Sequence, residues 1–417
     1  MTFKKVPGTR DILPDEVVLW QKIEETARNI FSAYNFREIR TPIIEEASLF
    51  NRSLGEFAEI VQKQMFLIKN KEDTYCLRPE GTAAIVRSYL ENSLDKTGGF
   101  TKFYYLGPMF RLERPQKGRL RQFHHIGAEV IGSDNPAVDV EVISLADSLL
   151  KGCEVEGYKI KINTLGCSKD KKALVALLEK ELKGRAGDFC EDCQVRLKHN
   201  ILRILDCKNE SCQKIVAGLN LEHKHLCEDC LKHFSAVKDG LDALKIEYEI
   251  TPHLVRGLDY YTRTVFEFKH ADLGAQDAVG AGGRYDNLIN ELGGAQVGAM
   301  GFALGMERLL LVTKLQGQKA ASRNLVYVIA LGEQAKPESM KLLDNLRKAG
   351  IVSDTDYEEK SLKGALRAAN DLSARLVLII GENELKKNTV MLKDMASGEQ
   401  KEIFTVELFK EIEARLK

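Results

Sequence analysis

The sequence lacks any long apolar run. Its longest aliphatic stretch extends only from Leu325 to Leu331, whereas a membrane-spanning helix needs ~20 apolar residues. Residues 1–8 also lack the apolar stretch of a secretory signal peptide. We therefore expect a cytoplasmic protein with no membrane partner.

A net charge of either sign is also missing. The 417 residues include 61 Lys and Arg against 61 Asp and Glu, so the formal net charge is zero. This balance excludes a general nucleic-acid coat protein, and any polyanionic partner must be bound by local basic patches. At ~150 residues per domain, the length predicts two or three domains.

The usual phosphate-binding loops are absent as well. The sequence contains neither Gly-x4-Gly-Lys-Ser/Thr nor Gly-x-Gly-x-x-Gly after a predicted strand. Any nucleotide must therefore be held by another arrangement of side chains.

The patterns that are present predict a mixed α/β protein. Residues 16–34 have apolar positions at helical spacing, and residues 37–44 predict a strand. Because Pro42 has no N–H group, this strand suits the edge of a sheet. Residues 103–131 predict an antiparallel hairpin with a long loop. The glycines at 280–283 indicate either a β-turn or a close approach of the backbone to a ligand.

Two further parts follow along the chain. Residues 168–247 are helical in pattern and rich in Lys, Glu and Cys, which predicts an insertion. Residues 317–322 are small or polar and predict a linker. Beyond them strands and helices alternate, as expected for a separate α/β domain.

Six of the nine cysteines lie between Cys190 and Cys230. In a reducing compartment, such crowding favours a metal site over disulfides. Two Cys-x2-Cys pairs have the spacing of zinc ligands, so we expect zinc at Cys190, Cys193, Cys227 and Cys230. Since one zinc ion takes four ligands, Cys207 and Cys212 are alternative members of the set. Reduced, partly buried cysteines without a metal are the other interpretation.

The hairpin loop is locally basic. Between Arg111 and Arg121 it carries five cationic side chains and one carboxylate. Taken alone, such a run is more often a solvated hairpin than a phosphate site. The segment from Phe110 to Glu129, however, resembles motif 2 of class II aminoacyl-tRNA synthetases. Its Arg-Pro-Gln-Lys-Gly-Arg run at residues 114–119 resembles the histidyl-tRNA synthetase family.

Four other stretches resemble the same family and occur in its motif order. They are residues 37–42 (motif 1), 77–82 (the amino-acid-binding loop), 254–263 (a peptide peculiar to histidyl-tRNA synthetases) and 301–309 (motif 3).

The resemblance implies an α/β protein of defined layout. It implies an α+β catalytic domain over residues 1–318, built on the antiparallel sheet of class II synthetases flanked by helices. The helical insertion at 168–247 interrupts it, and a linker at 319–325 leads to an anticodon-binding domain at 326–417. The implied reaction is activation of histidine by ATP, with Mg²⁺, to histidyl-adenylate, then transfer to the 3′ end of tRNA(His). Motif 1 implies a homodimer.

The resemblance also assigns residues to ATP. Arg111 and Arg256 would be catalytic, since attack of a carboxylate on the α-phosphate needs fixed cations. For Arg256, the alternative is a buried structural arginine paired with Asp259 or Glu267. The ATP-binding set is Arg111, Glu113, Arg119, Phe123 and Arg308, in which Phe123 and Arg308 would enclose the adenine ring.

Histidine and tRNA contacts follow in the same way. Histidine would be bound by Glu80, Gly81, Thr82, Arg111, His125, Glu129, Arg256, Tyr260, Tyr261 and Tyr285. At position 125 the family often has Gln, so His125 is a departure from its pattern. The acceptor end of tRNA would be met by Arg114, Gln116 and Lys117.

Two other functions compete with this interpretation. One is a synthetase-like regulatory subunit of ATP phosphoribosyltransferase, which usually lacks both the C-terminal domain and the arginine at 256. The other is a zinc-dependent nucleic-acid-binding module without catalysis, which leaves the motifs unexplained.

Overall fold

The computed structural model describes residues 3–55, 58–96, 100–219, 221, 223–316, 324–358 and 360–416. The chain divides into two compact units, Met1–Gln316 and Gly317–Lys417. The linker expected at residues 317–322 lies outside the described residues.

The first unit is built on an eight-stranded sheet with strand order β1-β5-β6-β11-β10-β9-β7-β8. Neighbouring strands are antiparallel except at the two edges, where β1 pairs with β5 and β8 pairs with β7 in parallel. The strands are β1 (Arg37–Glu38), β5 (Thr101–Phe110), β6 (Gln122–Ile131), β7 (Lys159–Thr164), β8 (Glu249–Ile250), β9 (Thr262–Lys269), β10 (Ala278–Arg284) and β11 (Ala299–Gly305).

The predicted hairpin at 103–131 is confirmed as β5 and β6. The strand predicted over residues 37–44 is wrong in its length. Only β1 joins the large sheet, at its edge, and the chain then enters a small sheet of order β2-β4-β3. Between the two sheets, the Arg78 guanidinium donates to the backbone oxygens of Thr41 (2.9 Å) and Pro42 (3.4 Å). The small sheet comprises β2 (Ile44–Glu46), β3 (Phe66–Asn70) and β4 (Asp73–Leu77).

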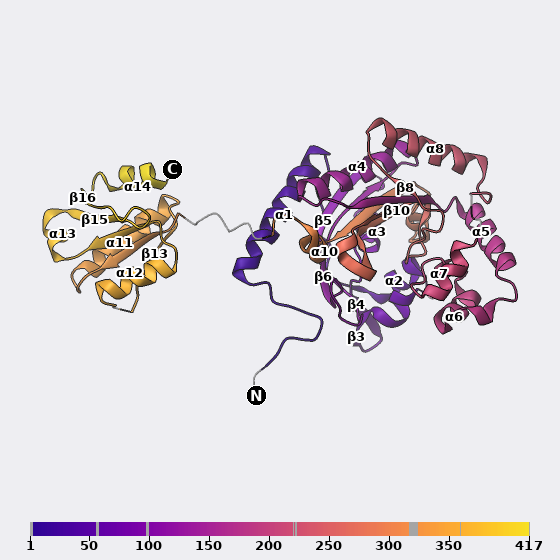
Figure 1. Ribbon diagram of the computed structural model, residues 1–417, viewed down its shortest axis with the longest axis horizontal. Coiled ribbons are helices and arrows are strands. Elements are labelled where there is room, and N and C mark those ends of the chain that lie inside the picture. The colour runs from indigo at the N-terminus through magenta and orange to yellow at the C-terminus, as the bar shows by residue number, and fades with distance from the viewer. Residues whose placement is uncertain are drawn as a thin grey trace. The chain divides into compact units, whose positions relative to one another are not determined.

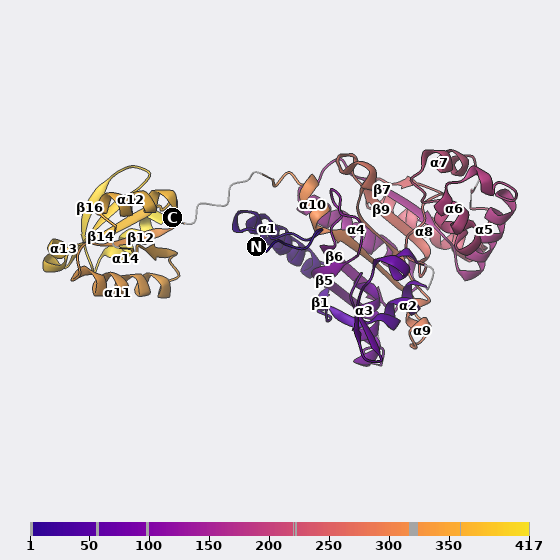
Figure 2. The same ribbon diagram turned by 90° about the horizontal axis from the view of Figure 1, so that it is seen from below.

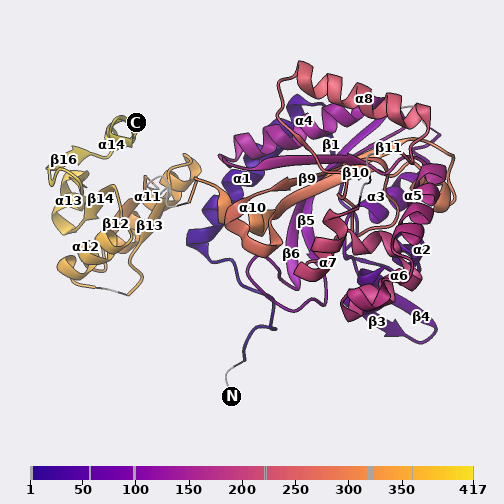
Figure 3. The same cartoon turned by 45° about the vertical axis from the view of Figure 1, so that its right-hand side comes forward.

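One face of the large sheet is covered by helices. Helix α4 (Pro136–Gly152) lies between α1 (Pro14–Ala33) and α8 (Glu228–Ala243), as Figure 1 and Figure 3 show. Their apolar side chains share a core with Ile126, Ala128 and Val130 of β6. Because side chains alternate along a strand, the odd-numbered residues of β6 point to the other face.

The remaining helices of this unit are α2 (Ala47–Leu54), η1 (Ile60–Gln64), α3 (Thr82–Glu91), η4 (Ala271–Gln276), α9 (Leu288–Glu291) and α10 (Met306–Val312). Of these, η4 and α10 contribute apolar side chains to the same core as α1 and α4. The helices of the insertion gather at the end of the unit remote from α1 (Figure 2). They are α5 (Ser168–Glu181), η2 (Ala186–Asp188), α6 (Glu191–His199), η3 (Ile201–Ile204) and α7 (Glu210–Ala217). Helix α8, which also lies within residues 168–247, packs instead on α4.

The second unit has a five-stranded sheet of order β13-β12-β14-β15-β16. The first three strands are parallel and the last two antiparallel. The predicted alternation of strands and helices is confirmed, but the hairpin β15–β16 was not expected. The strands are β12 (Val326–Ala330), β13 (Ser353–Thr355), β14 (Leu376–Ile380), β15 (Thr389–Asp394) and β16 (Gln400–Phe404). The helices are α11 (Ala335–Lys348), α12 (Leu362–Asp371), α13 (Glu382–Lys387) and α14 (Leu408–Leu416).

Within the described residues, none of the helices combines the length and the apolar character that a membrane span requires.

Candidate active site

A cleft with a cavity volume of about 180 Å³ opens on the face of the large sheet that points away from α1 and α4. Its walls come from the hairpin β5–β6, the start of α3, the segment before β9, and α10.

Small residues of β10 and β11 line the cleft, among them Ala281 and Ala303. Across the sheet, Gly127 of β6 pairs with Ala303 of β11, and Gly283 of β10 pairs with Gly301 of β11. A Cβ on Gly301 would lie 1.8 Å from Glu129 Oε2, and a Cβ on Gly127 would lie 2.4 Å from Tyr105 Cζ. These positions therefore need glycine so that Glu129 and Tyr105 can lie across them.

Glycines 280–283 lie inside strand β10 and not in a turn, so the β-turn interpretation is wrong. The Cβ that any other residue would add at Gly283 would lie 2.9 Å from the Tyr261 ring. The missing side chain leaves room for that aromatic wall.

Glu129 is the central acidic group and is almost completely buried. Its two carboxylate oxygens accept hydrogen bonds from Thr82 Oγ1 (2.7 Å) and from Tyr285 Oη (2.6 Å). Burial raises the pKa of Glu129 to about 8, in spite of these two donors. The carboxyl group can therefore hold a proton near neutral pH.

Glu80 supports the entrance to α3. Its carboxylate accepts from the backbone N–H groups of Thr82 (2.7 Å) and Ala83 (2.9 Å). Burial also raises the pKa of Glu80. Beside it, the rings of Tyr260 and Tyr261 lie 4.7 Å apart, and the ring of Tyr285 lies 5.7 Å from that of Tyr260.

Arginines converge from several segments. Arg111, fixed by a hydrogen bond to Pro79 O (2.9 Å), lies with its Cζ 5.2 Å from the centroid of the Phe123 ring. Arg308 donates to Gly118 O (2.9 Å) and Ala278 O (2.7 Å). Burial, and then the charges of Arg119 and Arg111, lower the pKa of Arg308. Cations held together against their mutual repulsion make a site for anions.

Arg256 lies in the same cleft but is ion-paired with Glu267. Burial acts to lower the pKa of Arg256, but the charge of Glu267, together with smaller contributions from Tyr261 and Asp206, leaves the pKa raised. Its Nε atom is buried and has no hydrogen-bond partner among the described residues. The ion pair with Glu267 that we expected for a purely structural Arg256 thus exists. One N–H group of the Arg256 guanidinium still has no hydrogen-bond acceptor in the described part of the chain.

His125 contacts Phe123 edge-on, with ring centroids 5.1 Å apart. Burial, together with the charges of Arg111 and Arg308, holds the pKa of His125 well below its usual value, so the ring is neutral. A neutral imidazole carries one hydrogen-bond donor and one acceptor. The amide side chain of the glutamine that the family often has here also offers both. Its Nδ1 atom is buried without a partner in the described chain.

The cleft thus brings together the residues expected to bind histidine and ATP, with Glu129 buried beneath Thr82 and Tyr285. The cleft-lining members of that set are Glu80, Gly81, Thr82, Arg111, Glu113, Arg119, Phe123, His125, Arg256, Tyr260, Tyr261, Tyr285 and Arg308. The residues expected to meet tRNA, Arg114, Gln116 and Lys117, are exposed on the β5–β6 loop.

Among the polar side chains that line the cleft, sequence reasoning missed two, Tyr105 and Glu307. Glu307 accepts from the backbone N–H (2.9 Å) and the Nδ1 atom (2.9 Å) of His124, which joins α10 to β6. Alternation along β5 could have identified Tyr105, since it lies opposite Gly127 in the register. The position of Glu307 depends on how α10 packs, which no local pattern gives.

The insertion supports one wall of the cleft. Lys171 Nζ of α5 donates to the backbone oxygens of Asp259 (2.6 Å) and Tyr261 (3.2 Å). Asn200 Nδ2 donates to the Asp259 carboxylate at 2.9 Å. The segment that carries Tyr260 and Tyr261 is therefore held in place by side chains of the insertion.

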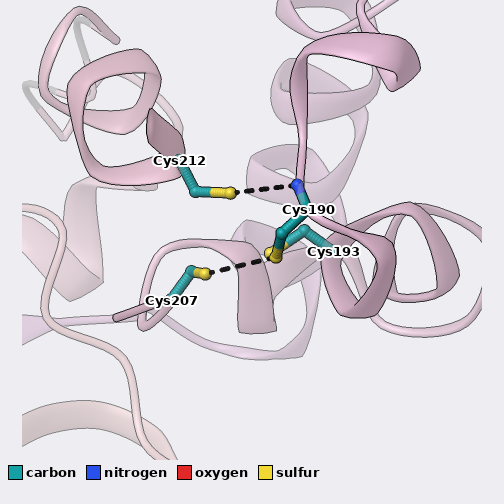
Figure 4. Close-up of side chains that lie close together, drawn as sticks. All are labelled: Cys190, Cys193, Cys207 and Cys212. Carbon is teal, nitrogen blue, oxygen red and sulfur yellow. Dashed lines mark hydrogen bonds between the residues drawn. The ribbon is translucent and has the colours of Figure 1, made fainter. Parts of the chain in front are cut away.

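The cysteines form two groups, and not the single set that we expected. Cys190, Cys193, Cys207 and Cys212 have sulfur atoms within 4.8 Å of one another, and Figure 4 shows the four side chains pointing toward a common centre. They come from the start of α6, from the turn after η3 and from α7. Cys227 and Cys230 lie instead with Cys167 and Asp170. Cys190, Cys193, Cys227 and Cys230 therefore cannot share one zinc ion. The spacing of Cys pairs failed to predict the sets because the chain folds back between them.

Comparison with known proteins agrees with this geometry. Residues 8–309 match the histidyl-tRNA synthetase family. The chain belongs to this family. Residues 325–415 match the anticodon binding domain family.

Relatives within the family are similar along nearly their whole length. The histidine–tRNA ligase of Thermotoga maritima is 45% identical over 97% of this chain and 96% of its own. That of Thermosipho melanesiensis is 46% identical over 96% of each chain.

Solved structures agree with the fold. A histidyl-tRNA synthetase from S. aureus matches with a TM-score of 0.82 and 35% identity over 100% of both chains. The class II synthetase fold expected from the sequence is confirmed. A Bacillus halodurans structure described as an ATP phosphoribosyltransferase regulatory subunit/histidyl-tRNA synthetase matches at a TM-score of 0.66 and 19% identity, over 91% of this chain and 99% of its own, and so shares the fold.

The raised pKa of Glu129 predicts a pH dependence of stability. The folded protein binds this proton more tightly than the unfolded chain, whose glutamate titrates near 4.5. The stability that Glu129 contributes is therefore complete below pH ~4.5 and is lost as the pH rises through ~8, by a few kcal/mol. Glu129→Gln cannot titrate, so its stability should fall less over this range.

Urea unfolding of the ligand-free protein at pH 5.5, 7 and 8.5 measures this difference. Glu25→Gln, which alters an exposed glutamate of α1, is the matched control and should follow the wild type. Parallel pH curves for the wild type and Glu129→Gln would contradict the assignment.

Proposed function

We infer that the protein is a histidine–tRNA ligase. It activates L-histidine with ATP to histidyl-adenylate and transfers the histidyl group to the 3′ end of tRNA(His), releasing AMP and diphosphate. The observation that carries this inference is the cleft itself, which joins a cluster of arginines to a buried carboxylate and three tyrosines. The arginine end of such a site suits two anions, a carboxylate and a phosphate, and the tyrosine end suits a polar ring such as imidazole.

The tyrosine end of the cleft would bind histidine. Glu80 and Thr82 would hold the α-ammonium group, since a carboxylate and a hydroxyl there can accept its protons. Glu129, Tyr260 and Tyr261 would surround the imidazole ring. His125 would supply the contact that the family's glutamine often makes, because its neutral ring retains an unpartnered nitrogen. Buried polar groups left unpaired by other side chains would reject other amino acids.

The arginine end would bind ATP. Arg111 would bridge the histidine carboxylate and the α-phosphate, and Arg119 would reach the triphosphate tail. Phe123 and Arg308 would enclose the adenine ring, with Glu113 near its amino group. Magnesium would enter with ATP, bound to its phosphates.

The reaction needs positive charge at the place where negative charge develops. As the histidine carboxylate attacks the α-phosphorus, negative charge grows on the phosphoryl oxygens and diphosphate leaves. Arg256 would oppose Arg111 across that phosphate. Its unsatisfied Nε–H is a donor available to an oxygen in the cleft.

Other parts of the chain would bind the tRNA. The exposed side chains Arg114, Gln116 and Lys117 lie on the loop whose Gly118 oxygen is tied to Arg308. They would meet the acceptor end close to the ATP site. Residues 326–417 would read the anticodon, since unpaired loops are where RNA sequence is accessible.

The wider assignments are proposals of the same kind. Residues 1–318 would form the catalytic domain around the insertion at 168–247, joined by a linker at 319–325 to the anticodon-binding domain. The enzyme would act in the cytoplasm as a homodimer. Strand β1 ends the large sheet, and Ile43 and Ile44 beyond it are exposed, which suits a subunit contact.

We also propose a structural zinc ion at Cys190, Cys193, Cys207 and Cys212. Four sulfur atoms ~2.3 Å from a tetrahedral zinc ion stand about 3.8 Å apart. The sulfur atoms of Cys190 and Cys207 are 3.8 Å apart. The backbone N–H of Cys190 also donates to Cys212 Sγ at 3.4 Å, which would stabilise a thiolate there.

The activity is tested by exchange of labelled diphosphate into ATP. Exchange should depend on L-histidine, and aminoacylation of tRNA(His) should follow. A regulatory subunit would give no exchange, and that result would overturn the proposed function.

Arg256→Ala should slow adenylation by about 10²- to 10³-fold, the scale for loss of one preorganised charge. The Michaelis constants for histidine and ATP should change little, because the charge acts mainly in the transition state. Transfer from preformed histidyl-adenylate should suffer less, since the α-phosphate is then part of the leaving group.

Single-turnover measurement of the two half-reactions provides the test. Glu267→Gln is the matched control, because it breaks the ion pair but keeps the guanidinium. Equal losses in the two variants would show that Arg256 only stabilises the fold.

Zinc at the first cysteine group should be lost in Cys212→Ser, which should contain one equivalent less than the wild type. Cys153→Ala alters a buried cysteine outside both groups and should retain all of it. Elemental analysis of protein purified without chelator measures the content. A difference below about a tenth of an equivalent would contradict the assignment.

A further inference from the structure

A second group of metal-binding side chains lies outside the cleft and is not used by the reaction. Cys167 and Asp170 begin α5, and Cys227 and Cys230 begin α8. The three sulfur atoms and one carboxylate oxygen all lie within 4.8 Å of one another. Two segments remote in sequence thus place four ligand atoms around one point.

We propose that Cys167, Asp170, Cys227 and Cys230 bind a second zinc ion, separate from the one at Cys190. Three sulfur ligands and one oxygen ligand match zinc, which accepts both in a tetrahedral site. Ligands at 2.0–2.3 Å from the ion stand roughly 3.3–3.8 Å apart, so a small contraction of this group would enclose it.

Helix positions support the assignment. Cys167 and Asp170 occupy the N-cap and N3 positions of α5, and Cys227 and Cys230 occupy the same positions of α8. In the first group, Cys190 and Cys193 occupy these positions of α6. At these positions the free N–H groups and the helix dipole stabilise negative charge on the ligands. Cys167 N–H donates to Cys230 Sγ at 3.2 Å, and Cys227 N–H donates to Asp170 Oδ1 at 3.0 Å.

A neighbouring ring adds an independent observation. His225, two residues before Cys227, has both ring nitrogens buried without a hydrogen-bond partner among the described residues. Buried polar atoms are normally paired. A metal ion beside them, or a water molecule bound to it, would supply the missing partner.

The site would close the insertion at both of its ends. Cys167 directly follows Gly166, whose oxygen accepts from Arg263 N–H at 2.8 Å, and Cys230 lies in the first turn of α8. An ion at this point would hold α5, and with it Lys171, against the segment that carries Tyr261.

Metal content of the full-length protein, purified without chelator, tests the proposal independently of the proposed reaction. The wild type should hold two equivalents of zinc per chain. Cys230→Ser and Cys212→Ser should each hold one, and Cys153→Ala should hold two. Loss of a zinc ion in Cys212→Ser but not in Cys230→Ser would overturn the second site and leave the first.

Cobalt substitution distinguishes the two ligand sets. Cys190→Ala/Cys212→Ala leaves the first group only two thiolates, so with one Co²⁺ bound it should show the d–d spectrum of the second group, with three thiolates and one oxygen. Cys230→Ser should show the spectrum of the first group, with four thiolates. Asp170→Cys, added to Cys190→Ala/Cys212→Ala, should shift its spectrum towards that of four thiolates. Identical spectra in Cys190→Ala/Cys212→Ala and Cys230→Ser would overturn the proposal.

Alkylation of the wild-type protein tests the second site without depending on whether a variant folds. Cys167, Cys227 and Cys230 should resist alkylation by N-ethylmaleimide until a chelator is added, as read by mass spectrometry. Equal alkylation with and without chelator would overturn the second site.

Discussion

The burial of one carboxylate, that of Glu129, is the constraint on which the cleft depends. A carboxyl group in the centre of a sheet face is costly unless hydrogen-bond donors reach it. Thr82 and Tyr285 provide those donors from two different segments. Gly301, opposite on β11, provides the space. The start of α3, the end of β10 and the register of β6 with β11 must therefore all be correct together.

The part of this site that lies on one strand could be predicted from the sequence pattern alone. Phe123, His125 and Glu129 alternate along β6, so they share a face whatever the rest of the chain does. Tyr260 and Tyr261 could be assigned only through the family's peptide. Nothing in the sequence pattern indicates that Tyr285, which directly follows β10, would reach Glu129.

Other features escaped sequence reasoning because they depend on tertiary packing. The cysteine sets are an example: Cys227 is closer in sequence to Cys212 than to Cys167, yet it lies with Cys167. The break between β1 and β2 depends on Arg78, which binds the carbonyl oxygens of Thr41 and Pro42. Residue spacing carries no information about contacts made across such distances.

The strand order of the large sheet has a consequence for how the protein is made. Strand β6 pairs on one side with β11, which is synthesised about 170 residues later. At ribosomal speeds, that interval is roughly 10 to 30 s. Throughout it, the nascent chain carries the hairpin β5–β6 with one edge unpaired, and such an edge invites pairing with other chains. Synthesis of this enzyme thus includes a period in which the strand that will line its cleft depends on chaperones or on the tunnel exit for protection.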